Sequence, residues 1–98
     1  MTDNQEVSRA QDAMRILDNA TYQEAMKALH AQIIEQWKDC PIRDAEGQLL
    51  LLQLAKLAEK FESILRGYIE SGKLAQRRID LNKQRNESKL RGLLRKAA

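Results

Sequence analysis

The fold is decided by residues 44–72, which read DAEGQLLLLQLAKLAEKFESILRGYIESG. Apolar side chains recur in this stretch at intervals of three and four residues, the spacing of one face of an α-helix. We expect the helix to begin at Asp44, a favourable N-cap, and to end at Ser71, with Gly72 as its C-terminal stop. Such a helix of about 27 residues would be about 40 Å long. Its main apolar stripe consists of Leu50, Leu54, Leu57, Phe61, Ile64 and Tyr68, with Leu51, Ala55, Ala58, Leu65 and Ile69 beside it.

A second amphipathic helix is predicted before this stretch. Thr21 and Glu24 have the spacing of a capping box, in which each side chain satisfies a free backbone N–H of the first turn. Pro41 ends the helix, because proline cannot continue it and disfavours the helical conformation of the residue before it. The apolar face of this helix is formed by Tyr22, Met26, Leu29, Ile33 and Trp37.

Together the two helices predict an antiparallel hairpin that reverses at Pro41. In the simplest register, Trp37 meets Leu49–Leu52 and Tyr22 meets Phe61–Leu65. The chain has one proline, four glycines and few β-branched residues, so we predict an all-α fold. Residues 1–7 are predicted to be disordered, a short helix to cover about residues 8–17, and residues 8–72 to form a helical-hairpin oligomerisation domain.

The long helix is expected to hold the chain in an oligomer. Its apolar surface is broader than one partner helix of about 18 residues can cover, and a body of this size is marginally stable without disulfides or metals. We therefore predict self-association into a homo-oligomer. The predicted interface residues are Leu50, Leu51, Leu54, Phe61, Leu65 and Tyr68.

Charge divides the chain into two unequal parts. Residues 1–72 carry eight Lys or Arg against twelve Asp or Glu, a net charge of −4, whereas residues 73–98 carry a net charge of +7. We call residues 73–98 the basic arm and expect it to be partly helical. A compact cluster of cations attracts phosphates, although the arm has no aromatic residue on which a base could stack. The candidate nucleic-acid-binding residues are Lys73, Arg77, Arg78, Lys83, Arg85, Lys89, Arg91, Arg95 and Lys96.

Several classes of function are disfavoured by what the sequence lacks. One cysteine (Cys40) and one histidine (His30) cannot build a disulfide within the chain or a metal-ligand cluster, so we expect neither metal nor cofactor. No paired carboxylates or activated nucleophile accompany His30, and we predict that the protein is not an enzyme. The longest apolar run, Leu49–Leu52, is too short to span a membrane, and the N-terminus lacks the apolar region of a signal peptide. A soluble cytoplasmic protein is expected.

The order of these elements resembles small helical proteins of tailed bacteriophages that are encoded among head and DNA-packaging genes. The resemblance covers about residues 15–75. It rests on the Thr21-capped helix that ends in Trp37, the Pro41 break, the Arg43–Gly47 turn and the Ser71–Lys73 exit. It implies a phage accessory protein, similar to the ring-forming small terminase subunits that bring viral DNA to the packaging motor. No helix-turn-helix domain precedes these elements, so sequence-specific recognition of DNA is not implied.

Three functions remain open at the level of sequence. The first is a non-enzymatic phage oligomer that binds nucleic-acid phosphates through the basic arm. The second is a virion-assembly or scaffold-like module whose arm docks on an acidic protein surface. The third is a phage-encoded inhibitor of a host defence component, a function that no specific residue of the chain supports. The expected location is the cytoplasm of the host cell, with association to the virion as an alternative.

Overall fold

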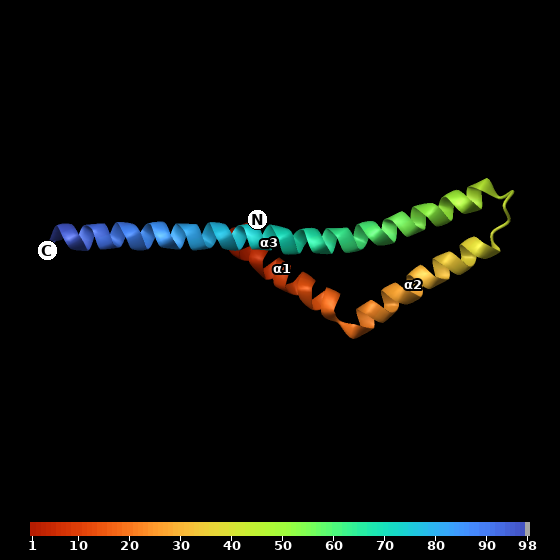
Figure 1. The fold of residues 1–98 in the computed structure, drawn as a ribbon, viewed down its shortest axis with the longest axis horizontal. Coiled ribbons are helices and arrows are strands. Elements are labelled where there is room, and N and C mark those ends of the chain that lie inside the picture. Colours follow the sequence, from red (N-terminus) through yellow and green to blue (C-terminus); the bar gives the residue numbers. More distant parts are fainter. Residues whose placement is uncertain (98) are drawn as a thin grey trace.

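The computed structural model describes residues 1–97, which fold into three α-helices and no strands. The helices are α1 (Asp3–Asp18), α2 (Ala20–Asp39) and α3 (Ala45–Ala97). The predicted all-α class is confirmed. In Figure 1, α3 is a long rod, α1 crosses it near its middle, and α2 returns from the far end of α1 to the start of α3. The molecule is elongated, with extents of 83 × 26 × 16 Å.

Helix α1 begins earlier than the sequence suggested, and residues 3–7 are helical where disorder was expected. The reason is a capping box at the very start of the chain. The Thr2 hydroxyl accepts a hydrogen bond from the Gln5 backbone N–H at 3.2 Å, and the Gln5 side-chain oxygen accepts one from the Thr2 N–H at 2.9 Å. Asp3 and Glu6 also place negative charge in the first turn, which favours the positive end of the helix dipole.

Asn19 separates α1 from α2 by acting as a cap for both helices. Its backbone N–H bonds to the carbonyl of Ile16 at 3.2 Å, which closes α1. Its side-chain oxygen accepts from the Tyr22 N–H at 2.9 Å, which opens α2. The N-cap of α2 is therefore Asn19, and Thr21, predicted to be this cap, lies inside the first turn.

The chain reverses direction between α2 and α3, over residues 40–44 (Figure 1). The Cys40 N–H bonds to the carbonyl of Trp37 at 3.3 Å, and Pro41 then prevents the helix from continuing. Asp44 caps α3 as predicted, since its carboxylate accepts a hydrogen bond from the Gly47 N–H at 2.9 Å.

Helix α3 does not stop at Gly72, as the sequence suggested, but continues without a break to Ala97. Gly72 is buried where α1 crosses α3, and a Cβ at this position would collide with the Cβ of Ala10. Ala13 and Ala75, each at most 2 % exposed, complete the crossing. Glycine within a helix costs about 1 kcal/mol relative to alanine. Here the absence of a side chain lets two backbones approach, so the residue serves packing and not termination.

Helix α2 lies less closely against α3 than α1 does, and none of its residues is buried. Both contacts that the predicted register placed between α2 and α3 nevertheless bring their residues together. The rings of Tyr22 and Phe61 have centroids 6.5 Å apart, and Trp37 lines a hollow with Leu51 and Leu52. The core is therefore concentrated at the α1–α3 crossing, and the space between α2 and α3 is incompletely filled.

The crossing makes two glycines of α3 respond oppositely to the same change. Gly67→Ala meets no atom within 4 Å of the added Cβ, so it should stabilise the fold by about 0.5–1 kcal/mol through helix propensity. Gly72→Ala should destabilise it despite the same gain in propensity, because the new methyl forces α1 away from α3. Urea unfolding followed by circular dichroism measures both. Equal stabilisation by the two substitutions would contradict the crossing.

Candidate nucleic-acid interface

The cations of the basic arm all project from one uninterrupted helix. Residues 73–97 belong to α3, and only Ala98 of the predicted arm lies outside the described residues. At about 100° of rotation per residue, eight of the nine cations fall on one half of the helix circumference. Lys83 lies on the other half, between Asp80 and Glu87 in the sequence. The eight are Lys73, Arg77, Arg78, Arg85, Lys89, Arg91, Arg95 and Lys96.

We call the surface formed by these eight residues the basic face. Its centre points away from α1, because α1 packs on the side of α3 that carries Gly72 and Ala75, more than about 100° from that centre. Arg78, at one edge of the face, is the member that reaches α1. All eight side chains are exposed to solvent. From Lys73 to Lys96 the face is about 35 Å long. It can therefore meet an extended polyanion without any rearrangement of the body.

Two cations of the basic face already have carboxylate partners. Arg78 bridges back to α1, where it contacts Asp3 at 3.1 Å and Glu6 at 2.9 Å. Lys73 pairs with Glu70 one turn earlier on α3, at 3.1 Å. The remaining cations of the face form no ion pair within residues 1–97. The part of the face that is free to bind an external anion therefore lies mainly beyond Arg78.

The outer part of the arm has little support from the body. A hollow between the N-terminal end of α1 and helix α3 is lined by Asn4 and by residues of α3 from Ile79 to Leu90. Every residue from 81 to 97 is exposed except the half-buried Gly92. The outer arm is thus a helix surrounded by solvent, including its Leu90, Leu93 and Leu94.

The predicted oligomer-interface residues divide into two groups. Leu51 and Leu65 are only 8 % and 7 % exposed within the single chain, and the ring of Tyr68 lies under the guanidinium of Arg9, 4.1 Å from its centroid. These three side chains are already engaged in contacts within the chain. By contrast, Leu50, Leu54 and Phe61 remain between 41 and 57 % exposed.

An apolar groove runs between α2 and α3 beside the exposed leucines. Its volume is about 330 Å³, and every residue that lines it is apolar. Met26, Leu29 and Ile33 form the α2 wall. The α3 wall consists of Leu54, Leu57, Ala58 and Phe61. Such a groove can exclude water from an apolar partner, but it offers no polar group to orient a small substrate.

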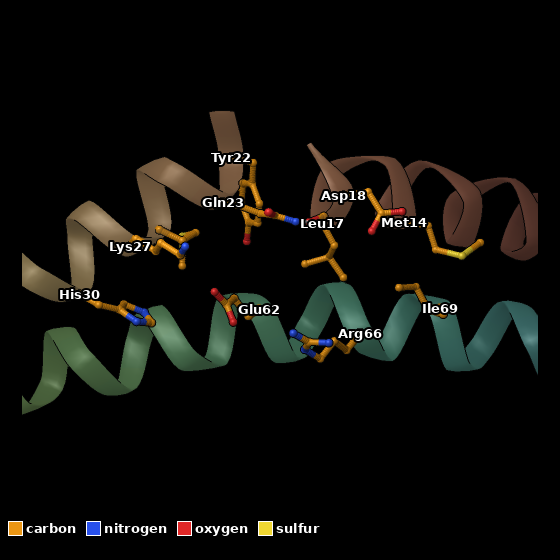
Figure 2. Close-up of a pocket in the computed structure, with 11 residues that line it drawn as sticks. Met14, Leu17, Asp18, Tyr22, Gln23, Lys27, His30, Glu62, Arg66 and Ile69 are labelled. Atoms are coloured by element: carbon orange, nitrogen blue, oxygen red, sulfur yellow. Dashed lines mark hydrogen bonds between the residues drawn. The ribbon is translucent and has the colours of Figure 1, made fainter. Parts of the chain in front are cut away.

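A second hollow, of about 510 Å³, lies inside the elbow of α1 and α2 and faces α3 (Figure 2). Two cations, Lys27 and Arg66, and two anions, Asp18 and Glu62, line it, so its charge favours neither sign of ligand. The Tyr22 hydroxyl and the His30 Nε2 are buried without a hydrogen-bond partner. Burial raises the pKa of Tyr22, and the nearby Glu62 raises it further against the opposing effect of Arg66. Its phenol is therefore no readier to ionise than a free one.

Cys40 and the acidic residues do not assemble into a reactive site. Burial raises the pKa of the Cys40 thiol, and the charge and hydrogen bond of Asp44 raise it further, which opposes formation of the nucleophilic thiolate. Across residues 1–97, no group of three or more His, Cys, Asp or Glu side chains is placed to hold a metal ion. No helix in the same range is both long and apolar enough to cross a lipid bilayer.

Comparison with known proteins does not assign a family. No protein-family model matches the sequence, and neither the curated proteins nor the solved structures contain a significant match. The charges and surfaces of the chain itself are therefore what points to its function.

Two features of the site were not foreseen from the sequence. The Arg78 contacts with Asp3 and Glu6 join residues more than seventy positions apart, and nothing local signals them. The segregation of Lys83 from the other cations could have been found, because it follows from helical periodicity once residues 73–97 are taken as a continuous helix. The expected stop at Gly72 concealed it.

Hydrogen exchange should divide α3 at the end of its contacts with α1. Amides of residues 65–79 lie in or beside the crossing and should be well protected, whereas those of residues 84–97 should exchange nearly as fast as in an isolated helix, which is marginal in water. Exchange measured by NMR or mass spectrometry on the full chain tests this. Uniform protection along α3 would show that the arm is held by contacts other than those within one chain.

Proposed function

We propose that the protein binds nucleic acid through the phosphate backbone, using the basic face of α3, and that it catalyses no reaction. One observation carries the proposal: eight cations lie on one half of a single solvent-exposed helix, on the side away from α1. The acidic Asp80 and Glu87 fall on the other half with Lys83. A helix of this kind can bring its cations to a phosphate chain while Asp80 and Glu87 lie outside the basic face, about 20° and 40° beyond its edge.

The chemistry of the face favours binding without sequence preference. The arm carries guanidinium and ammonium groups but no aromatic side chain, so contacts to phosphates dominate over stacking on bases. An α-helix fits the width of the DNA major groove, which would bring cations on both edges of the basic face near phosphates of the two strands. Each neutralised phosphate releases counterions, and the binding constant should fall steeply with salt.

Self-association belongs to the same proposal. One arm offers few contacts, whereas arms joined in an oligomer convert later contacts into intramolecular ones and raise the overall affinity. The resemblance to small helical phage proteins suggests viral DNA during packaging as the nucleic acid.

A second candidate function is docking of the basic face on an acidic protein during assembly. The specific observation in its favour is Arg78, which binds two carboxylates of a neighbouring helix, Asp3 and Glu6. A partner helix with acidic residues at similar spacing would find the same chemistry along the arm. Binding to DNA and to an acidic protein would differ in salt dependence, because only DNA releases condensed counterions on this scale.

The proposal predicts a different effect for two lysines of the same helix. If about six phosphates of duplex DNA are contacted, a plot of log Kd against the logarithm of the salt concentration should have a slope of magnitude about 5. Lys89→Gln removes a cation from the basic face and should lower that magnitude by about 0.9. Lys83→Gln removes the same charge from the opposite half of α3 and should leave the slope nearly unchanged. Fluorescence anisotropy with labelled duplex DNA at several salt concentrations measures both variants.

Two outcomes would contradict this function. Equal slopes for the two variants would mean that charge alone, and not the basic face, determines binding. Failure of the full chain to bind duplex DNA or single-stranded RNA at about 50 mM salt, where non-specific binding is strong, would reject the nucleic-acid partner. The acidic-protein partner would then lead.

A further inference from the structure

The surface that a single chain leaves uncovered is too large for a compact monomer. The chain exposes 8268 Å², whereas a compact protein of the same 11.3 kDa would expose about 5,700 Å². Its radius of gyration is 23.0 Å, against about 13 Å for a compact domain of this length. A standard interface buries about 800 Å² per partner, roughly a third of the excess. The solvent-exposed arm accounts for part of the excess, and the apolar seam described next offers area for an interface.

The uncovered part of the body has the pattern of a coiled-coil seam. Five residues of α3 follow one another at alternating spacings of four and three, and each is between 41 and 63 % exposed. This open seam consists of Leu50, Leu54, Leu57, Phe61 and Ile64. A neighbouring line of α3 residues, spaced seven positions apart, is buried within the chain. It consists of Leu51, Ala58, Leu65 and Gly72. Helix α3 thus carries two adjacent seams, of which its own chain buries only one; α2 borders the other but leaves it exposed.

From this pattern we infer that the open seam is the contact surface for a second copy of the chain, in an antiparallel two-fold dimer whose axis passes near Leu57. In each copy the open seam forms a ridge, and Leu54, Leu57 and Phe61 of this seam are also one wall of the apolar groove. A ridge and a groove side by side allow the same surface to complement itself across a two-fold axis. Leu57 lies at the middle of the seam and is its most exposed member, at 63 %.

Charge selects the antiparallel arrangement. In a parallel pair, the two basic arms would lie side by side with a net charge of +7 each. In an antiparallel pair centred on Leu57, the arms leave at opposite ends, and the first cations of each arm pass the partner's turn between α2 and α3. That turn with its flanking residues, 38–46, carries Asp39, Asp44 and Glu46 against Lys38 and Arg43, a net charge of −1. The antiparallel pair thus avoids the repulsion between the two basic arms and places each arm beside the partner's turn, which attracts it.

The inference deepens the self-association in the proposed function and rests on that proposal. Its test needs no nucleic acid, so the two can fail separately. Sedimentation equilibrium of the full chain should show a dimer that dissociates at least about tenfold more readily after Leu57→Glu, the loss expected for a central apolar contact. Leu57→Lys should act alike. Because the residue lies near its own symmetry mate, mixing the two variants should restore the dimer as a heterodimer.

A matched control and a cross-linking pair fix the surface and its direction. Leu81→Glu changes a similarly exposed leucine, at 53 %, outside the seam and should leave association unchanged. In a Cys40→Ser background, Leu50→Cys mixed with Ile64→Cys should give a disulfide-linked heterodimer under mild oxidation, while Leu50→Cys alone should not link efficiently. Circular dichroism of each variant shows that the helices persist.

Several outcomes would overturn the inference. The first is a full chain that sediments as a monomer, or as a trimer or larger ring, at about 100 µM, well above the Kd of a specific dimer. The second is an equal loss of association for Leu57→Glu and Leu81→Glu. The third is no recovery of the dimer when the two oppositely charged Leu57 variants are mixed. Efficient homodimer cross-linking through Leu50→Cys would show a parallel pair instead. Loss of DNA binding with an intact dimer would reject the proposed function and leave the interface standing.

Discussion

The close approach of α1 and α3 at Gly72 is the contact on which the rest of the structure depends. Ala10 and Ala13 on one helix meet Gly72 and Ala75 on the other, and the small side chains let the two backbones pack tightly. This crossing fixes the position of α1, and through the Asn19 cap it also fixes the point from which α2 starts. Most large apolar side chains lie outside it. Small residues supply the fit, and the contact of Tyr68 with Arg9 and the ion pairs of Arg78 extend it along both sides.

Because the crossing occupies the middle of α3, the two ends of that helix have different environments. Toward the N-terminus, α3 presents a broad apolar surface that α2 covers only loosely. Toward the C-terminus, it leaves α1 behind and becomes a charged helix in solvent. Association through one end and anion binding through the other would therefore use surfaces that meet only at the first cations of the basic arm. The distribution of charge and apolar area along one helix makes the proposed binding and the inferred dimer compatible with each other.

Sequence reasoning captured the parts of this structure that depend on local signals. The apolar period of residues 44–72, the Asp44 cap and the break at Pro41 all follow from rules that act within a few residues. It misjudged Gly72, since a glycine that ends a helix and a glycine that admits a neighbouring helix look alike until the neighbour is known. Leu51, Leu65 and Tyr68 were predicted to lie at an oligomer interface, and within one chain they already make contacts of their own. Sequence alone does not show this, because tertiary packing decides which of two adjacent stripes a chain buries for itself. The partners of Arg78 could not be predicted from the sequence either, because tertiary packing also decides them.

The continuity of α3 through Gly72 also gives the molecule a fixed helical phase. A flexible linker would let the cations sample all directions, so only their number would matter. In an unbroken helix, the angle between the apolar seam and the basic face is set by the count of residues between them, at about 100° for each. Deleting a single uncharged residue from the exposed part of α3 just beyond the crossing would turn every later cation by that angle while preserving net charge and helicity. The length of this segment thus sets the direction in which the basic face points relative to the apolar seam.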